Sequence, residues 1–461
     1  MGMENLEDFC LLSACTADGP RTRPYGTTVK PQHTVHPSLI RRGRKGTEGT
    51  GNEAGIVLII VAAVALMSAA AVALNDSADN SDENSGLPAY TVSGSADFDG
   101  NIYVSFVYSK NIMMLDSQGN VVWYKHEDTG DTPAGFWDFK KHVVGGVTYY
   151  SYHDQDVICD KFGLPGFAPG DRVILDENFN EVKRIRFETS PRGIVEQGHP
   201  LDGHDFLLID LDHYIMSGYL KEEVHNIPSD LCHIDDPKVI YSYLQEVDHG
   251  EVVWEWRSID YPDTYRMTQT DATANANDFD NLTTDAPDYV HFNAMRLDEN
   301  GRLICSFRHL DSVLCLDRTN NTPSGQILWR LSGTAEPNSI PRFDMDDGLI
   351  TSGQHYVTVE GPGIVRVFNN NNAGEHTCVR IFTLDEGNMT AAAQDLTVPG
   401  RFSSACGSVE HIAGDIYAIG WGKAENDTKC MSVYDFSTGT ELMYMELENG
   451  NNFTYRCAYY P

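Results

Sequence analysis

One pattern recurs along the chain and limits its fold more than any other feature. Each copy is an apolar stretch, a turn rich in Asp, Asn and Gly, and a second apolar stretch, which is the signature of a β-hairpin. The copies begin at residues 114, 174, 243, 315, 367 and 433. Three copies also place a tryptophan four residues after a glycine, in the pairs Gly119 and Trp123, Gly250 and Trp254, and Gly325 and Trp329. The pattern therefore predicts one structural unit used several times.

Six hairpins at intervals of roughly 50 to 70 residues, with further apolar strands between them, predict an all-β repeat fold. We expect a six-bladed β-propeller over residues 88–461, because each blade of a propeller is a small antiparallel sheet. A large β-sandwich is the alternative, but the recurrence of the glycine and tryptophan positions favours the propeller. The chain has 461 residues, 41% of them hydrophobic, which is enough for one large core or a repeat array.

The chain before residue 88 differs from the rest. Residues 1–53 mix Pro, Gly, Thr and charged residues without periodicity, and we expect them to be disordered. Residues 54–74 are apolar or small and carry no charge, and as a helix this length spans a bilayer core of about 30 Å. An acidic linker over residues 75–87 follows. The expected architecture is a propeller behind an N-terminal transmembrane segment.

The charges beside the apolar run predict its orientation. Basic residues precede it and acidic residues follow it: Arg41, Arg42, Arg44 and Lys45, then Asp76, Asp79, Asp82 and Glu83. Under the positive-inside rule, residues 1–53 are cytoplasmic and the propeller is extracytoplasmic at the cell membrane. The run is alternatively a signal peptide, because the small residues 71–73 resemble a cleavage site. The propeller is exported in either case.

Acidic residues dominate the composition. Asp and Glu number 67 against 33 Lys and Arg, and the formal net charge is −34. Such a chain repels nucleic acid, so we expect no nucleic-acid partner. Eight of the ten cysteines lie after residue 88, and an even number outside the cytosol suggests disulfides. None has the spacing of a metal-binding C-x-x-C pair, and Cys305 in an apolar strand is expected to be a buried free thiol.

Histidines occur at matching places in three of the repeats. The strands that precede the hairpins are expected to be the inner ones, and three of them begin HDFLLID, HFNAMRL and QHYVTVE. We therefore expect His204, His291 and His355 to meet at one end of the central channel. Asn293 lies two residues after His291 on the same strand face, and Arg308 returns to that end on the next strand. A shared polar cavity would explain why these residues interrupt apolar strands.

The residue types narrow the chemistry of this set. Three histidines and a water form a known zinc site, but an arginine in the same cavity would repel a dication. Arg308 instead favours an anion with several oxygens, which its planar group holds at two points. Each residue taken alone also fits a structural role, such as a turn histidine or an ion-paired arginine. Three other histidines lack the matched position and are interpreted as structural or exposed: His199, His309 and His411.

These segments resemble the bacterial arylsulfate sulfotransferase family. The similar stretches are DYVHFNAM at 288–295, SFRHLDSV at 306–313, SGQHYVTV at 352–359 and VFNNN at 367–371, and others extend over most of residues 88–461. The H-x-N, S-x-R-H and Q-H segments in this order carry the resemblance. The chain lacks a close cysteine pair before His355 and the family's threonine in the last blades.

The resemblance implies a fold and a reaction. Such enzymes are six-bladed propellers that transfer a sulfuryl group from an aryl sulfate to a phenolic acceptor by a ping-pong mechanism, without the nucleotide donor PAPS, a metal or another cofactor. It implies that His355 is the transiently sulfurylated nucleophile. His204, His291 and Arg308 match residues that bind and polarise the sulfuryl oxygens, and Asn293 matches the substrate-binding asparagine of the H-x-N segment.

Two other classes of function compete with this one. The first is a non-catalytic cell-surface propeller that binds aromatic or sulfated ligands. The second is a quinone-dependent dehydrogenase, but that class is expected to show a calcium site and tryptophans in the channel rather than three histidines. The sequence leaves the natural donor and acceptor, and the oligomeric state, open.

Overall fold

The computed structural model describes residues 78–79, 86–107, 109–130, 134–156, 162, 166–269, 277–280, 286–319, 326–334, 337, 339–345, 351–374, 376–425, 427–448 and 453–461. The chain divides into two compact units, residues 1–56 and 57–461, and all described residues belong to the second. None of the helices in the described residues is long and apolar enough to cross a membrane. The predicted disordered segment 1–53 and transmembrane segment 54–74 lie outside the described residues, as does most of the linker.

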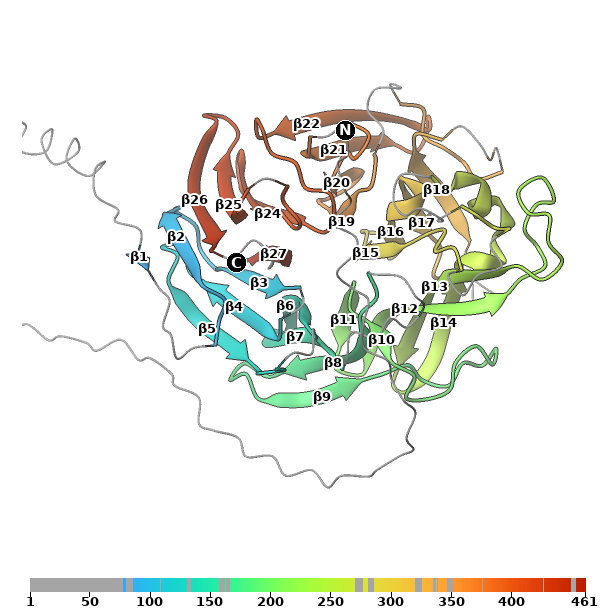
Figure 1. Cartoon of the computed structure of the whole chain (residues 1–461), viewed down its shortest axis with the longest axis horizontal. Helices are drawn as coiled ribbons and strands as arrows, with labels where there is room; N and C mark the ends of the chain where they lie inside the picture. The colour runs from blue at the N-terminus through green and yellow to red at the C-terminus, as the bar shows by residue number, and fades with distance from the viewer. Residues whose placement is uncertain are drawn as a thin grey trace, which may run out of the picture. The chain divides into compact units, whose positions relative to one another are not determined.

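Six antiparallel sheets surround a common axis and form a six-bladed β-propeller, which confirms the predicted all-β fold (Figure 1). Blade 1 contains β27 (Thr454–Tyr460), β3 (Asn101–Phe106), β4 (Asn111–Leu115) and β5 (Val121–His126). Blade 2 contains β6 (Phe136–Val144), β7 (Val147–Gln155), β8 (Pro169–Leu175), β9 (Glu181–Ile185) and the short β10 (Leu201–Asp202). Blade 3 contains β11 (Phe206–Asp210), β12 (His213–Glu223), β13 (Lys238–Asp248) and β14 (Glu251–Arg257).

The remaining three blades follow the same order from the axis outward. Blade 4 contains β15 (Phe292–Leu297), β16 (Leu303–Phe307), β17 (Ser312–Leu316) and β18 (Ile327–Ser332). Blade 5 contains β19 (His355–Val359), β20 (Ile364–Asn369), β21 (Cys378–Asp385) and β22 (Thr390–Thr397). Blade 6 contains β23 (Ser408–Ala413), β24 (Ile416–Gly420), β25 (Lys429–Asp435) and β26 (Thr440–Leu447), and then β2 (Tyr90–Gly94) and β1 (Ala78–Asp79).

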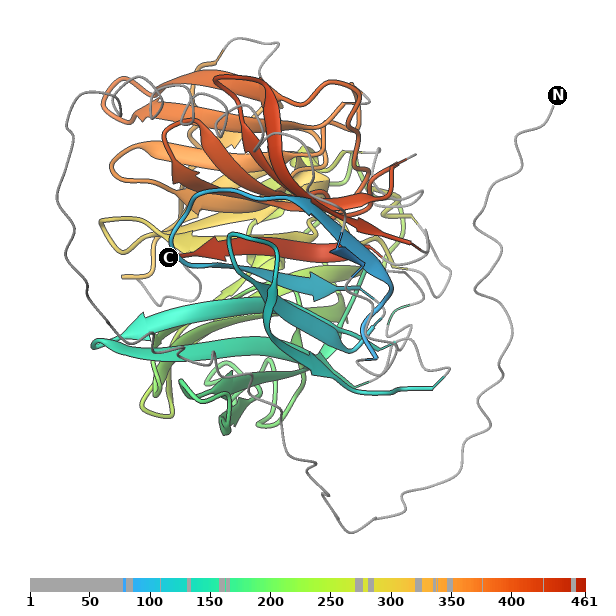
Figure 2. The same cartoon turned by 90° about the vertical axis from the view of Figure 1, so that its left-hand side faces the viewer.

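Strands from the two ends of the propeller sequence close the ring. The late strand β27 pairs with β3 and becomes the innermost strand of blade 1, where it lies beside strands from the other end of the propeller sequence (Figure 2). The early strand β2 pairs with β26 on the outer side of blade 6. Strands distant in sequence therefore share each of these two sheets, and backbone hydrogen bonds within the sheets hold both ends of the propeller sequence in the ring.

Five of the six predicted hairpins are outer hairpins of blades, and one is not. The copies at 114, 174, 243, 315 and 433 correspond to β4–β5, β8–β9, β13–β14, β17–β18 and β25–β26. The copy at 367 is instead the connection from β20 to β21, and the outer hairpin of blade 5 is β21–β22. The asparagine-rich stretch after β20 resembles a tight turn but begins a longer connection, which accounts for the error.

The recurrent tryptophans seal one blade against its neighbour. Trp123 on β5 stacks on Phe179 of blade 2, with ring centroids 4.3 Å apart. The indole N–H of Trp254 on β14 donates a hydrogen bond to the carbonyl oxygen of Asp317 in blade 4 at 3.2 Å. Trp329 on β18 packs edge-on against Phe343, with centroids 5.2 Å apart. The repeat thus reflects the need for a large amphipathic ring between blades.

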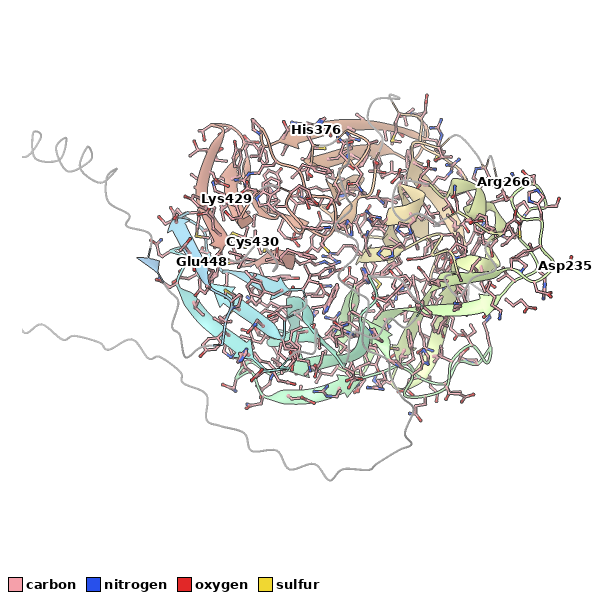
Figure 3. All side chains as sticks on the ribbon, viewed as in Figure 1. Asp235, Arg266, His376, Lys429, Cys430 and Glu448 are labelled. Atoms are coloured by element: carbon pink, nitrogen blue, oxygen red, sulfur yellow. The ribbon has the colours of Figure 1, made fainter. Side chains whose placement is uncertain are left out.

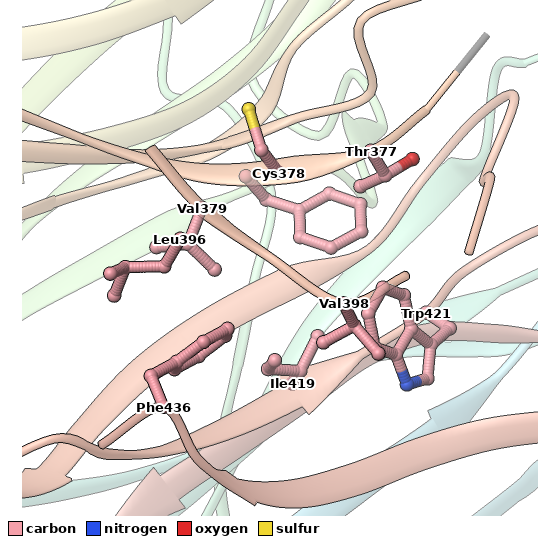
Figure 4. Close-up of a pocket in the computed structure, with 9 residues that line it drawn as sticks. Thr377, Cys378, Val379, Leu396, Val398, Ile419, Trp421 and Phe436 are labelled. Carbon is pink, nitrogen blue, oxygen red and sulfur yellow. The ribbon is translucent and has the colours of Figure 1, made fainter. Parts of the chain in front are cut away.

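Side chains fill the space between the blades, so the core is spread around the ring rather than concentrated in one layer (Figure 3). Blades 5 and 6 enclose a small apolar pocket lined by Phe368, Thr377, Cys378, Val379, Leu396, Val398, Ile419, Trp421 and Phe436 (Figure 4). None of the predicted site residues lines this pocket. The seven described cysteines of the propeller are free thiols, and Cys305 is buried as expected.

Candidate active site at one end of the propeller axis

Each of the six inner strands places one residue at the same end of the axis, at or next to the start of the strand. In blade order from 1 to 6 these residues are Tyr455, Trp137, His204, His291, His355 and Cys406. Contacts between neighbouring members run around this end. The rings of Tyr455 and Trp137 are 4.8 Å apart, those of His204 and His291 are 5.0 Å apart, and the Cys406 N–H lies 3.2 Å from Nε2 of His355. We call these six residues the mouth ring.

The structure brings together the residues that the sequence predicted for a site. His204, His291, His355 and Arg308 are all buried, with at most 8% of each residue exposed. The charge of Arg308 acts on both His291 and His355. His355 begins the inner strand of blade 5, and His291 and His204 lie one and two residues before the inner strands of blades 4 and 3.

The backbone at the mouth ring departs from regular β geometry. Four inner strands carry a β-bulge there, at Trp137–Lys140, Phe292–Ala294, His355–Val357 and Thr454–Arg456. His291, Tyr356 and Cys406 have positive φ angles of 46°, 54° and 58°. Such a conformation is costly for residues other than glycine, and it persists at functional sites where the surrounding structure holds it. The bulges turn the mouth-ring side chains toward the axis.

The contacts of His355 fix which of its ring nitrogens carries hydrogen. Nδ1 lies 2.8 Å from Oδ1 of Asn370 and 3.1 Å from the carbonyl oxygen of Gly353, and both of these are acceptors. The backbone N–H of Cys406 points at Nε2 from 3.2 Å. Nδ1 must therefore donate and Nε2 must hold the lone pair.

The hydrogen bonds of Asn370 support this assignment of the His355 tautomer. Its Nδ2 group donates to the carbonyl oxygens of Ser403 at 2.9 Å and Cys406 at 3.1 Å, so the amide cannot be turned over without losing both bonds. Its Oδ1 is then left for His355. Sequence reasoning did not identify Asn370 as a site residue. The only signal was the run of asparagines that ends β20.

His204 and His291 share a second arrangement. Each ring Nδ1 contacts the carboxylate of an aspartate just before it in the chain, Asp202 for His204 and Asp288 for His291, the latter at 2.6 Å. Burial, followed by the charges of His204 and Arg308, holds the pKa of His291 well below its usual value. His309, interpreted as structural or exposed, is buried and stacks on His291 with ring centroids 4.7 Å apart.

Arg308 is the anion-binding candidate of the site. It opens the short 3-10 helix η3 (Arg308–Leu310), and its backbone N–H donates to the carbonyl oxygen of His291 at 2.8 Å. Its guanidinium donates to the carbonyl oxygen of Ser404 at 3.3 Å. Blades 4 and 6 thus jointly orient a cation beside His291 and His355, which matches the predicted return of Arg308 to this end.

Asn293 has a contact that the sequence did not predict. Its side chain is fully buried and its Nδ2 donates to the carbonyl oxygen of Gln354 at 2.8 Å, which ties blade 4 to blade 5 next to His355. Its Oδ1 is buried, and within the described part of the chain it has no hydrogen-bond partner. A substrate-binding role for Asn293 therefore stays a prediction.

A buried network of ion pairs lies next to the mouth ring. Asp205, which follows His204, pairs with Lys140, with Arg296 at 3.1 Å and with Arg456 at 3.4 Å. These residues come from blades 3, 2, 4 and 1. Burial lowers the pKa of Lys140 to about 8, although Asp138 and Asp205 oppose the shift. Satisfied buried charges of this kind fix the relative positions of the inner strands.

The three predicted histidines do not form a metal-binding group. In the residues that the structure describes, Asp288, His291 and His309 form one group whose ligand atoms lie within 4.8 Å of one another. Both of its Nδ1 atoms are already engaged, His291 with the Asp288 carboxylate and His309 with the Asp288 carbonyl oxygen. Hydrogen bonding alone therefore accounts for the geometry of this group.

Comparison with solved structures finds other chains at low similarity. A streptogramin B lyase is 8% identical, with 78% of this chain and 89% of that chain covered and a TM-score of 0.36. The dihydro-heme d1 dehydrogenase NirN is 12% identical over 81% and 71%, with a TM-score of 0.33, and virginiamycin B lyase from Staphylococcus aureus is 6% identical over 78% and 99%, with a TM-score of 0.31. These scores carry no conclusion about function, and a comparison with curated protein sequences gives no match.

The comparison with protein families is specific. The model of the family described as Arylsulfotransferase (ASST) matches residues 77–456, which include every mouth-ring residue and all six blades except the last four residues of β27. Membership of this family implies aryl sulfotransferase activity on small aromatic substrates. This chain therefore belongs to the arylsulfotransferase (ASST) family.

Proposed function

We propose that the propeller moves a sulfuryl group from an aryl sulfate ester to a phenolic acceptor in two steps, through a covalent intermediate on Nε2 of His355. The fixed tautomer of His355 carries the proposal. Asn370 takes the Nδ1 hydrogen at 2.8 Å and the Cys406 N–H faces Nε2 at 3.2 Å, so the lone pair lies on a known atom. A neutral imidazole with its lone pair held in place is a competent nucleophile.

Electrostatics supports the neutral state of His355. Burial, followed by the charge of Arg308, holds the pKa of His355 well below its usual value, although the hydrogen bond to Asn370 opposes the shift. The nucleophile is therefore available near neutral pH without loss of a proton. A covalent intermediate then divides one difficult displacement into two easier ones.

Arg308 and a backbone amide supply the charge stabilisation. In transfer of a sulfuryl group, as of a phosphoryl group, charge builds up on the non-bridging oxygens. A preorganised donor such as the Arg308 guanidinium typically lowers such a barrier by about 3 kcal/mol. When Nε2 of His355 forms its bond to sulfur, the Cys406 N–H loses its acceptor and becomes a donor for a sulfuryl oxygen.

The proposal includes the location of the reaction. Residues 54–74 are apolar and follow a basic cluster, which favours a single membrane span with the propeller outside the cytoplasm, or export followed by cleavage. Aryl sulfates and phenols would then be taken from the extracytoplasmic side. Protease added to intact cells should degrade the propeller, and full protection of the propeller would contradict this location.

The decisive experiment is a burst assay on the propeller with 4-nitrophenyl sulfate and no acceptor. The wild type should release one burst of phenol and gain about 80 Da, the mass of one SO₃ in this covalent scheme. His355→Ala should lose both the burst and the adduct. His376→Ala is the matched control, because His376 is exposed and its ring contacts the carbonyl oxygen of the nearby Gly374 (Figure 3).

The binding-module alternative gives a different result in the same assay. In that case the wild type would bind aryl sulfates but never gain mass, and His355→Ala would bind them equally well. This outcome would rule out the transfer reaction.

A further inference from the structure

Two aspartates that sequence reasoning did not single out hold two of the mouth-ring histidines. Asp202 accepts the backbone N–H of His204 at 3.0 Å and also contacts its ring Nδ1. Asp288 accepts the backbone N–H of His291 at 3.2 Å and lies 2.6 Å from its ring Nδ1. Both carboxylates are buried. A carboxylate that accepts hydrogen bonds from both the backbone and the ring of one histidine fixes the orientation of that ring.

Asp202 is an acceptor at both oxygens. Its Oδ2 accepts the backbone N–H of Ala168 at 2.8 Å, while its Oδ1 faces His204. Burial raises the pKa of Asp202, but the charge and hydrogen bond of His204 and the amide of Ala168 outweigh it and leave the pKa below its usual value. An ionised acceptor requires hydrogen on Nδ1 of His204, so Nε2 is the nitrogen on the other side of the ring.

The electrostatics of the Asp288–His291 pair differ from those of the Asp202–His204 pair. Burial raises the pKa of Asp288 to about 6, while burial and the charges of His204 and Arg308 hold the pKa of His291 well below its usual value. Both shifts disfavour a charged histidine in this pair.

The two aspartate–histidine pairs face each other. The rings of His204 and His291 have centroids 5.0 Å apart and planes at 89°, and each ring also contacts Tyr219 at 5.6 Å. Two imidazolium charges at this spacing would repel each other. The spacing therefore favours one additional proton on the pair over two.

We propose that Asp202 and Asp288 are positioning residues that hold His204 and His291 as Nδ1–H imidazoles, so that the pair carries one mobile proton on its Nε2 side. This inference rests on the proposed function and describes how its protons move. Under it, neither aspartate touches the substrate. Each aspartate acts through its histidine.

The proton balance closes over one turnover. In the first step the sulfur–aryl oxygen bond breaks, the sulfur–Nε2 bond to His355 forms, and the pair gives its proton to the departing aryl oxygen. In the second step the acceptor phenol returns a proton to the pair while its oxygen bonds to sulfur and the sulfur–Nε2 bond breaks. No proton is required from water, and the same pair acts as acid and then as base.

The test uses Asp202→Asn and Asp288→Asn in the full propeller. Nitrogen-15 NMR of histidine-labelled protein should show Nδ1–H tautomers for His204 and His291 in the wild type and a changed tautomer at the affected ring in each variant. Asp280→Asn is the matched control, because Asp280 accepts the backbone N–H and ring Nδ1 of the exposed His233 in the same way. The turnover kinetics of Asp280→Asn should equal those of the wild type.

Turnover with a series of aryl sulfates supplies the second readout. Both site variants should lose about 100-fold in kcat on aryl sulfates whose leaving phenols have a high pKa. They should lose much less on 4-nitrophenyl sulfate, because acid–base catalysis matters most for poor leaving groups. The His355 adduct should still form. Unchanged tautomers, or an unchanged dependence on the leaving group, would overturn the inference. A wild type that transfers no sulfuryl group would instead refute the proposed function, and the NMR result would still decide the tautomers.

Discussion

Asn370→Ala tests whether the orientation of the nucleophile depends on one amide. The substitution removes the nearer of the two acceptors of the His355 Nδ1 hydrogen and two donors, to Ser403 and Cys406. The lost bond to His355 should slow sulfurylation about fivefold, since a neutral hydrogen bond contributes about 1 kcal/mol and 1.4 kcal/mol is a factor of ten. The two carbonyl oxygens left without this donor should lower the free energy of unfolding by roughly 2 to 5 kcal/mol.

The assay is the single-turnover burst with 4-nitrophenyl sulfate, at a temperature where near-ultraviolet circular dichroism shows that the variant is folded. Asn371→Gly is the control, because Asn371 has a φ of 54° that suits glycine, and its side-chain amide donates to the carbonyl oxygen of His376. It should retain the wild-type burst rate. A folded Asn370→Ala with a burst rate within about twofold of the wild type would refute the orientation argument, since a net hydrogen bond is worth more than that.

Three further outcomes are expected. Because the pKa of His355 lies well below its usual 6.5, the burst rate should stay level as the pH falls through 6.5, and a burst rate that titrates at pH 6.5 would contradict this. The free energy of unfolding should decrease below pH 6.5, because the unfolded chain binds protons there that the folded state does not bind. Arg308→Lys keeps the positive charge but loses the planar guanidinium that can hold two oxygens at once. Turnover should therefore fall about tenfold or more while the mass adduct still forms. Asp205→Asn should lower the free energy of unfolding by about 3 to 5 kcal/mol in denaturant titration, because Lys140 and its partners lose a buried counter-charge; a loss below about 1 kcal/mol would contradict it.

The parts of the site that depend on the repeat could be predicted from sequence. His355 starts an inner strand, His291 and His204 lie one and two residues before one, and the strand order of a blade places all three at one end of the axis. Arg308 follows from the same rule, because the next antiparallel strand returns to that end. A repeated unit converts positions in the chain into positions around a ring, which is why spacing alone was sufficient here.

The parts that depend on side-chain direction could not be predicted. Asp202 and Asp288 lie two and three residues before their histidines, and nothing in such a spacing shows whether a carboxylate turns back onto the ring. In a regular strand the side chain of Asn293 would lie on the same face as that of His291. The bulge at Phe292–Ala294 breaks this alternation, and Asn293 donates to the carbonyl oxygen of Gln354 instead. Bulges have no dependable sequence signal, since they arise from the packing of neighbouring strands.

The inner position of β27 determines when during synthesis the mouth ring can be completed. Tyr455 on this strand donates a hydrogen bond to the carbonyl oxygen of His204 at 2.8 Å, across 251 positions of sequence. Arg456 beside it binds the carbonyl oxygen of Asn293 and the carboxylate of Asp138. All three histidines precede this strand in the chain, so synthesis completes them before the strand that holds their surroundings exists. The mouth ring is therefore assembled only when β27 enters the propeller and supplies these contacts to blades 2, 3 and 4.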